Sequence, residues 1–272
     1  MRPTSTRLLA VLAAGLIIVT AACGSSKSSS SSSGTSVPGA TSAKLVTPGT
    51  LTICSDIPYA PFEFEDNGTL TGFDVNLVDA MAQTLDLKTS WQTTPFDTII
   101  TALAAGNCDI IASATTIRDE RKEKVDFTSA YFDADQSLLV LTKDKDTYKT
   151  LADLAGKTIG VQAGTTGETY AEENKPAGAT IKSFPGADDL FAALASGDIQ
   201  AILQDYPVNQ YRAVKNPAEF VVTQKIPTGE QYGIAVAKTN TELLNQLNTA
   251  LATARSNGTY DSIYTTWLGA KS

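Results

Sequence analysis

The stretch Asp97–Ser113, DTIITALAAGNCDIIAS, contains the pattern that decides the fold class of this chain. Asp97 is suited to cap a helix, and apolar side chains follow it at helical spacing until Gly106 ends the helix. The next apolar run, 109–113, is typical of a buried strand. A helix followed directly by a buried strand indicates an α/β fold, in which helices cover both faces of a mostly parallel sheet.

The same pattern recurs in the second half of the chain. The letters ALASG at 193–197 nearly repeat ALAAG at 102–106, and a strand-like run follows each copy, the second at 201–203. The other elements expected from periodicity are a strand at 51–54, a helix from Asp74, a strand at 158–162, a strand at 232–236, and helices around 243–251 and 260–267. One copy in each half predicts two similar α/β lobes, whereas a chance repeat of a common helix ending is the alternative.

Composition excludes several classes of function. The chain has 272 residues, of which 42% are hydrophobic, enough for one large or two ordinary domains with a buried core. With 21 Lys+Arg against 29 Asp+Glu, the formal charge of −8 argues against nucleic-acid binding, which needs a basic face. The chain contains no His, so His-based triads, His general bases and His-ligated zinc are ruled out.

The first residues are typical of a secretory signal. In 1–22, Arg2 and Arg7 precede an apolar run that is too short to span a membrane, and small residues lead to Cys23. We expect a lipoprotein processing site with Cys23 as the lipidated N-terminus; ordinary cleavage nearby is the alternative. Residues 23–47 are rich in Ser, so we expect a flexible tether. Removal of the signal leaves 19 basic against 29 acidic residues, a formal charge of −10.

Cys54 and Cys108 remain as an even pair in a chain that carries a secretory signal. Oxidation to a disulfide fits that compartment, and two buried free thiols are the alternative. We expect no metal site, because neither a CxxC spacing nor a His accompanies the two residues.

Polar side chains follow four of the predicted strands, at the sheet edge where parallel-sheet folds bind ligands. The guanidinium of Arg121 and the N–H groups of the turn at 164–167, which opens a helix, suit a carboxylate. The carboxylate of Asp205 suits an ammonium group, so the set predicts a site for a zwitterion. The alternatives are a solvated Arg121 in a charged run, Asp205 as a helix N-cap, and 164–167 as a plain turn.

Five ordered motifs resemble those of the polar amino-acid-binding lipoproteins of bacterial ABC importers, the extracellular solute-binding protein family 3. The motifs are Asp56–Phe64 with Gly72–Asp74, Thr116–Arg121 with Val125–Tyr131, Gly164–Thr166, Gln204–Asp205, and Asn257–Tyr260 with Trp267. They span about Thr50 to Leu268. The resemblance implies a periplasmic-binding-protein-like (type II) fold, with lobe 1 at 48–134 and 233–272, lobe 2 at 135–232, two hinge strands, and the amino acid in the cleft.

The resemblance also implies a role for each side chain of the site. Arg121, helped by Thr166, would bind the ligand α-carboxylate, and Asp205 would bind the α-ammonium. The other implied ligand-binding groups are the backbone of Ala114, the hydroxyl of Thr116, the rings of Tyr59 and Phe96, and the side chains of Asp56, Gln162 and Gln204. The last three favour a ligand with a polar or cationic side chain, such as glutamine, arginine or lysine.

Two further points follow from the resemblance. Family strand order places the strand of Cys54 beside that of Cys108, which implies a disulfide between them. Arg118 stands where the family usually has Thr, directly before the Asp-Glu-Arg motif.

The expected function is that of the solute-binding component of an ABC amino-acid importer, lipid-anchored to the outer face of the cytoplasmic membrane. We expect a monomer without cofactor or catalysis, which closes on a free polar or cationic L-amino acid and docks on a permease that works with an ATPase. One alternative is a cleft enzyme, a prephenate- or arogenate-type dehydratase, for which Glu120 and Glu168 are the nearest acids. The other is a sensory lipoprotein that works without a transporter.

Overall fold

The computed structural model describes residues 43–269, which belong to one compact unit, Val37–Ser272. The predicted signal at 1–22, Cys23 and the tether up to residue 42 lie outside the described residues. Within the described part of the chain, none of the helices is long and apolar enough to cross a membrane.

The end of the predicted tether belongs to the folded unit. Val46 N donates a hydrogen bond to Asp109 Oδ1 at 2.7 Å, and Thr47 forms an isolated β-bridge with Thr50. Leu45 packs against the hydrophobic core. These contacts correct the prediction of a flexible segment up to Thr47, because apolar and backbone groups here already have partners in the fold.

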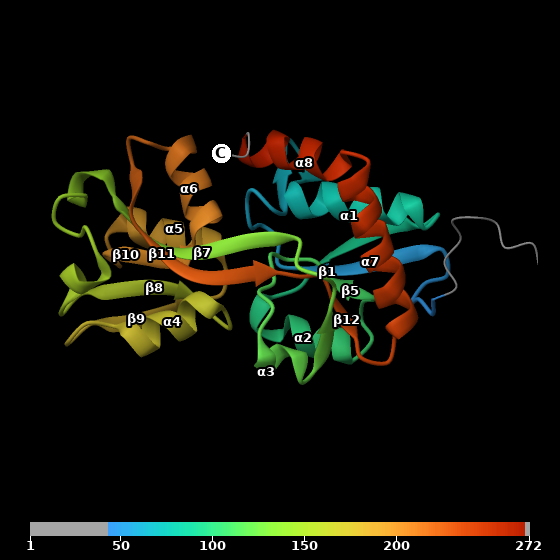
Figure 1. Cartoon of the computed structure of the whole chain (residues 1–272). Coiled ribbons are helices and arrows are strands. Elements are labelled where there is room, and N and C mark those ends of the chain that lie inside the picture. Colours follow the sequence, from blue (N-terminus) through green and yellow to red (C-terminus); the bar gives the residue numbers. More distant parts are fainter. Residues whose placement is uncertain (1–42, 270–272) are drawn as a thin grey trace, which may run out of the picture. The chain divides into compact units, whose positions relative to one another are not determined.

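Two five-stranded sheets form the frame of the unit (Figure 1). The first, in the order β4-β1-β5-β12-β6, contains β1 (Thr50–Ser55), β4 (Lys88–Thr93), β5 (Ile110–Ile111), β6 (Val125–Phe127) and β12 (Ala235–Ala237). The second, in the order β11-β7-β10-β8-β9, contains β7 (Phe132–Leu141), β8 (Thr158–Gln162), β9 (Thr180–Phe184), β10 (Ala201–Asp205) and β11 (Phe220–Tyr232). A separate hairpin pairs β2 (Phe64–Asp66) with β3 (Thr69–Thr71).

The two sheets have the same internal design. In each, one strand runs opposite to the other four: β12 in the first sheet and β7 in the second. The repeated ALAAG and ALASG phrases occupy equivalent places, because each ends a helix that leads into the central strand, β5 or β10. The predicted α/β class with two similar, mostly parallel sheets is therefore confirmed.

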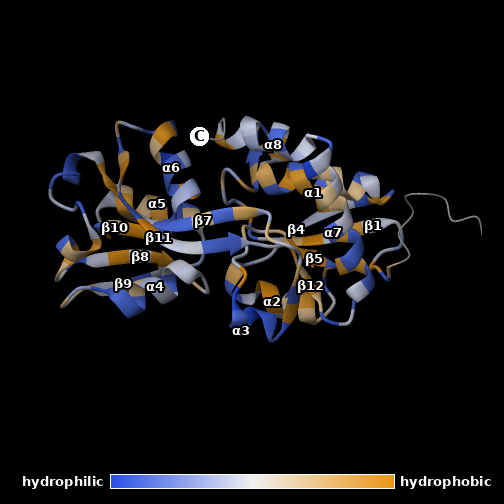
Figure 2. Ribbon diagram, in the orientation of Figure 1, coloured by the Kyte–Doolittle hydropathy of each residue, from blue (hydrophilic) through white to orange (hydrophobic). Residues whose placement is uncertain are grey.

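Helices cover the faces of both sheets (Figure 1). The α-helices are α1 (Phe73–Thr84), α2 (Ile99–Ala104), α3 (Asp119–Lys122), α4 (Thr166–Asn174), α5 (Ala187–Ser196), α6 (Tyr206–Lys215), α7 (Thr241–Ser256) and α8 (Thr259–Leu268), and the 3-10 turns are η1 (Phe96–Thr98), η2 (Thr142–Asp144) and η3 (Leu151–Leu154). Figure 2 shows apolar residues along β5, β8, β10 and α2 and hydrophilic residues on α3. Burial of apolar surface between helices and strands therefore stabilises each sheet.

Two predicted details are wrong. Asp97 lies inside η1, and no side chain caps either η1 or α2, because the chain enters α2 through a 3-10 turn. The single strand predicted at 232–236 is two strands, since β11 ends at Tyr232 and β12 begins at Ala235. Gly233 lies between them, where a Cβ atom would approach Ile117 Cγ1 to 2.8 Å. At this glycine the chain leaves one sheet for the other.

The long strands β7 and β11 carry the chain into and out of the second sheet. They pair antiparallel from Leu141↔Phe220 to Phe132↔Tyr232, with two register shifts. Figure 1 shows them extending from the second sheet toward the first. The lobe boundaries predicted at 134/135 and 232/233 fall near the start of β7 and the end of β11.

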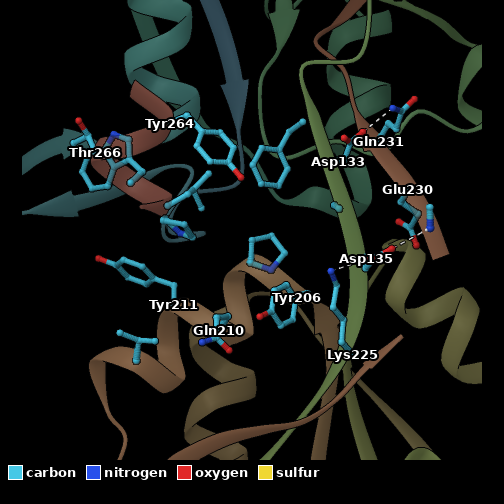
Figure 3. Close-up of a pocket in the computed structure, with 18 of the residues that line it drawn as sticks. Asp133, Asp135, Tyr206, Gln210, Tyr211, Lys225, Glu230, Gln231, Tyr264 and Thr266 are labelled. Atoms are coloured by element: carbon cyan, nitrogen blue, oxygen red, sulfur yellow. Dashed lines mark hydrogen bonds and ion pairs between the residues drawn. The ribbon is translucent and has the colours of Figure 1, made fainter. Parts of the chain in front are cut away.

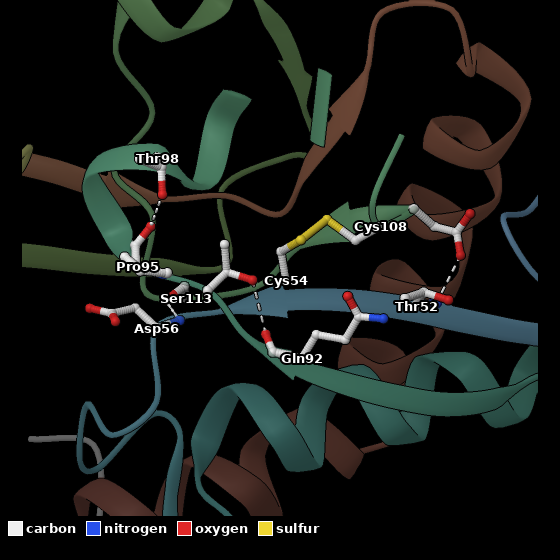
Figure 4. The surroundings of a disulfide bond; sticks show 10 residues. Thr52, Cys54, Asp56, Gln92, Pro95, Thr98, Cys108 and Ser113 are labelled. Atoms are coloured by element: carbon white, nitrogen blue, oxygen red, sulfur yellow. Dashed lines mark hydrogen bonds between the residues drawn. A yellow bond between two sulfur atoms is a disulfide. The ribbon is translucent and has the colours of Figure 1, made fainter. Parts of the chain in front are cut away.

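A disulfide joins Cys54, on β1, to Cys108, two residues before β5 (Figure 4). The two Cα atoms are 5.7 Å apart, and both residues are buried. The bond connects residues that are 54 positions apart in the sequence. It links the segments of β1 and β5, whose ends lead to Asp56 and Ser113.

Candidate ligand-binding site

A small pocket lies where strands of both sheets end. Its lining comprises Asp56, Tyr59, Phe96, Ser113, Ala114, Thr116, Arg121, Gln162, Thr165, Thr166 and Asp205. The first seven belong to segments around the first sheet and the last four to segments around the second. The space between the lining atoms, part of it open to solvent, is about 290 Å³. The fold therefore brings together nine of the ten side chains that the sequence predicted.

Arg121 supplies the positive charge of the pocket. Its Nη1 donates to Thr116 O at 2.9 Å and its Nη2 to Gly164 O at 3.1 Å. The guanidinium lies over the ring of Phe96, 5.2 Å from the centroid. Burial, with Arg118 nearby, lowers the pKa of Arg121 to about 10. Arg121 is therefore a half-buried, oriented cation at neutral pH and not a solvated residue of a charged run.

The turn before α4 presents the start of a helix to the pocket. Thr165 is the N-cap, and its Oγ1 accepts a hydrogen bond from Glu168 N at 3.1 Å. Glu168 Oε2 accepts in return from Gly164 N at 2.8 Å. Thr166 is the first helical residue, so its position carries the partial positive charge of the helix start. Segment 164–167 is thus a capped helix entry beside Arg121, suited to a carboxylate.

Asp205 supplies the negative charge on the opposite side. It precedes α6, but its side chain makes no capping hydrogen bond and turns toward the pocket instead. Its Oδ2 accepts from Tyr59 OH at 2.9 Å and from Tyr232 OH, and its Oδ1 accepts from Gln136 Nε2 at 2.6 Å. Burial, with Glu230 nearby, raises the pKa of Asp205 to about 6. At neutral pH Asp205 is mostly ionised, and it attracts a cationic group.

A second acid lies at another part of the lining. Asp56 follows β1, and its Oδ2 accepts a hydrogen bond from Gln162 Nε2. Gln162 also donates to Pro185 O at 3.3 Å. Burial raises the pKa of Asp56 to about 6, against the effect of the Gln162 hydrogen bond and with a contribution from Asp97. This acid–amide pair is an acceptor of hydrogen bonds and of positive charge.

The segment after β5 contributes backbone and hydroxyl groups. Ala114 has a φ of 43°, in the left-handed region that is unusual for a residue with a side chain. Its N–H is already donated to Asp74 Oδ2 at 2.9 Å, so its contribution to a ligand is its carbonyl oxygen. Thr116 Oγ1 donates to Glu230 Oε2 at 3.0 Å.

Gln204 is the predicted residue that does not line the pocket. Successive strand residues face opposite sides of a sheet, so Gln204 points away from the side that Asp205 faces. Its side chain is buried, and neither amide atom has a hydrogen-bond partner among the described residues. The prediction that Gln204 contacts the ligand is corrected accordingly.

The sequence reasoning missed the partners that orient Asp205. Gln136 and Tyr232 are fully buried and come from β7 and β11, the two strands that link the sheets. The one available signal was a Gln-Ser pair, Gln136 and Ser137, directly before the apolar run at 138–141. Ser113 and Thr165 were also missed as lining residues.

A larger groove lies beside α6 and α8, lined by aromatic rings such as Tyr206, Tyr211 and Tyr264 (Figure 3). One pair of its charged side chains lies across β7 and β11, with Lys225 Nζ 3.0 Å from Asp135 Oδ2. None of the described residues that line it is an arginine. The strand-end pocket, where a cation and an anion face the same space, is therefore the better ligand site. Within residues 43–269, no group of three or more Cys, Asp or Glu side chains is arranged to hold a metal ion.

Two similar α/β sheet units that share one polar pocket at their strand ends define a solute-binding protein. The family of bacterial extracellular solute-binding proteins, family 3, matches residues 51–270. The chain belongs to that family.

Relatives of known function are similar over most of the chain. ABC transporter arginine-binding protein 1 of Escherichia coli is 36% identical, and the match covers 77% of this chain and 86% of the relative. The histidine-binding periplasmic protein of Salmonella typhimurium is 34% identical, with 82% and 89% covered. Both are named as binding proteins for an amino acid.

Solved structures show the same fold. An ancestral arginine-binding protein bound to arginine has a TM-score of 0.76 at 40% identity, covering 81% of this chain and 99% of that one. An ancestral amino acid-binding protein, described as a precursor of cyclohexadienyl dehydratase, has a TM-score of 0.75 at 39% identity, with 80% and 95% covered.

Proposed function

We propose that this protein is the solute-binding component of an ABC importer and captures a free amino acid between Arg121 and Asp205. The observation that carries the proposal is one small pocket lined by a cation from one sheet unit and an anion from the other. The two charged groups of an amino acid are attached to the same carbon atom, so they need those two partners at once. Arg121 with the start of α4 would bind the α-carboxylate, and Asp205 with Ala114 O and Thr116 Oγ1 would bind the α-ammonium.

The ligand side chain is polar or cationic in this proposal. It would extend along the rings of Tyr59 and Phe96 toward Asp56 and Gln162, which accept hydrogen bonds and positive charge. Arg121 is the one cation among the described residues that line the pocket, and the α-carboxylate occupies it. An acidic side chain would lack a partner, so aspartate and glutamate are disfavoured. The arginine and histidine ligands named for the relatives support this assignment.

Ligand binding would favour closure of two lobes, 48–134 with 233–272 and 135–232, about β7 and β11. Hydrogen bonds already join the two sides, from Arg121 to Gly164 O, from Gln162 to Asp56 and from Tyr59 to Asp205. A ligand that contacts both sides stabilises the closed form, which would then dock on a permease that works with an ATPase. A lipid on Cys23 would keep the protein, as a monomer, at the outer face of the membrane.

We further propose that the protein binds its ligand without chemical change. Glu120, one acid that the sequence offered for dehydratase chemistry, has a side chain that is 72% exposed and pairs with Arg118. Glu168, the other, accepts hydrogen bonds from Gly164 N and Ser183 Oγ at the helix entry. Neither lines the pocket. Incubation with prephenate or arogenate should leave both compounds unchanged.

Titration calorimetry of the mature protein against the twenty amino acids tests the binding proposal. We expect micromolar or tighter binding of at least one polar or cationic amino acid. Arg121→Ala should weaken it at least tenfold, because a charge-assisted hydrogen bond is lost. The matched control is Lys122→Ala, on the same short helix but exposed and paired with Asp119. Absence of binding by every amino acid, or equal affinity of Arg121→Ala and wild type, would refute the proposal.

A further inference from the structure

Two buried acids lie behind the pocket and are not part of its lining. The side chain of Glu63 is 0% exposed and that of Asp74 1% exposed. Neither takes part in an ion pair within residues 43–269. Two buried carboxyl groups without a cation carry a large desolvation penalty. Their presence here therefore needs a physical explanation.

The backbone brings the two acids together. Asp74 N donates to Phe62 O at 3.0 Å, so the residue before Glu63 contacts the residue that carries the second acid. Gly72 makes this approach possible, because a Cβ atom there would lie 2.1 Å from Phe62 O and its φ of 135° disfavours a side chain. The close contact of the segments at 61–63 and 72–74 is therefore built into the chain.

Each acid holds one residue of the pocket lining. Ser113 Oγ donates to Glu63 Oε1 at 2.8 Å and itself accepts from Asp56 N at 2.9 Å, a contact that Figure 4 shows. Ala114 N donates to Asp74 Oδ2 at 2.9 Å. The second bond holds the left-handed backbone of Ala114, a residue of the pocket lining.

The remaining oxygen atoms of the two acids are Glu63 Oε2 and Asp74 Oδ1. Both are buried, and neither has a hydrogen-bond partner among the described residues. Two neighbouring carboxylates cannot both be ionised in such a site without strong repulsion, and one proton shared between them removes it. Burial and the charge of Asp74 raise the pKa of Glu63 well above its ordinary value, and burial raises the pKa of Asp74 to about 6. Of the two acids, Glu63 is therefore the one that would hold the proton.

The groups around the pair do not supply a competing charge. Asp56 and Tyr59 face Glu63 from the loop after β1, and Tyr131 faces Asp74 from the segment before β7. Tyr131 OH donates to Asp74 Oδ2 at 2.6 Å. The Tyr131 hydrogen bond favours ionised Asp74, whereas the charge of Asp56 disfavours ionisation of Glu63, so together these neighbours favour one proton on the pair.

We propose that Glu63 and Asp74 are positioning residues that share one proton and fix Ser113 and Ala114 for ligand binding. This inference rests on the proposed amino-acid site. The pair acts through the backbone of Ala114, which would meet the ligand ammonium group, and through the loop that carries Asp56. The pair thereby converts two buried charges into one, while both pocket residues keep a hydrogen-bond acceptor.

The first test measures the protonation state of Glu63 directly and needs no ligand. Carbon-13 NMR of the side-chain carboxyl carbons in the wild-type protein, titrated from pH 4 to pH 9, distinguishes protonated from ionised Glu63. Glu65 is the internal reference, because it is exposed on β2 two residues away. We expect Glu63 to be protonated at pH 7. An ionised Glu63 at pH 7 would overturn the shared proton.

The second test separates positioning from simple burial, with arginine as the probe ligand in calorimetry at pH 7. Asp74→Leu removes the acceptor of the Ala114 N–H and should weaken binding at least tenfold. Asp74→Asn keeps an oxygen at Oδ2 that can accept from the Ala114 N–H, so it should recover most of that loss. Equal losses in the two variants would overturn positioning, as would wild-type affinity in Asp74→Leu.

The third test uses pH. At alkaline pH wild-type Glu63 ionises beside ionised Asp74, so affinity should fall relative to Glu63→Gln, which has no proton to lose. Glu65→Gln is the matched control and should follow wild type. Identical pH profiles of wild type and Glu63→Gln would contradict the inference. Failure of wild type to bind arginine or any other amino acid would instead refute the proposed function, and the NMR titration would still report on the proton.

Discussion

Replacement of Asp56 by Asn tests how the site would recognise a cationic side chain. Asn has nearly the same shape, and its oxygen can still accept the hydrogen bond from Gln162 Nε2, so the lining should keep its geometry. The substitution removes the charge and turns one acceptor oxygen into an amide donor. It therefore separates charge recognition from packing.

The magnitude follows from the kind of bond that is lost. A hydrogen bond to a charged group contributes roughly 1.5–3 kcal/mol, and a neutral one about 0.5–1.5 kcal/mol. Arginine, whose side chain would pair with ionised Asp56, should bind Asp56→Asn roughly ten- to 150-fold more weakly. Glutamine, which can donate its amide to either residue, should lose less than about tenfold. Competition calorimetry with both ligands measures the ratio directly.

A pH series tests the same reasoning independently, because it predicts the direction in which the ratio of the two affinities changes. The pKa of Asp56 is raised to about 6 by burial, and a cationic ligand would bind its ionised form. The ratio of arginine to glutamine affinity in wild type should therefore be highest above pH 6 and decrease as the pH falls through 6. The pKa of Asp205 is also about 6, but Asp205 would bind the ammonium group of both ligands. Its titration therefore affects both affinities equally and cancels in their ratio. In Asp56→Asn the ratio should not change with pH. Equal losses of affinity for arginine and glutamine in Asp56→Asn would show that Asp56 does not distinguish the two ligands.

Three further perturbations have expected outcomes. Arg118→Ala removes the 3.2 Å hydrogen bond to Thr169 Oγ1 across the two sheet units, so stopped-flow should show ligand dissociation several-fold faster with association nearly unchanged; slower association alone would contradict this. Gly72→Ala should lower the unfolding free energy by roughly 3 kcal/mol, because its Cβ would meet backbone atoms, and wild-type stability in urea would disprove the clash. Removal of the Cys54–Cys108 bond by double Ala substitution should destabilise by about 4 kcal/mol for a loop of 54 residues, and an unchanged melting temperature would count against that.

The sequence by itself determined the fold class, because alternating apolar periods report local structure. The repeated ALAAG and ALASG phrases end helices that lead into equivalent strands, β5 and β10. The motifs around Arg121 and Asp205 carried enough ordered information to indicate the family. A charged or aromatic residue after a buried strand was the useful local signal, since strand ends meet at one sheet edge.

Only the tertiary structure decided how those side chains are oriented. Asp205 follows a strand and precedes a helix, so its sequence context fits an N-cap equally well, and the contact with Tyr59, 146 residues away, settles its direction. The side of the sheet that Gln204 faces and the approach of Glu63 to Asp74 are likewise settled by packing. These features depend on contacts between distant segments, and sequence periodicity describes only which face of its own element a residue occupies.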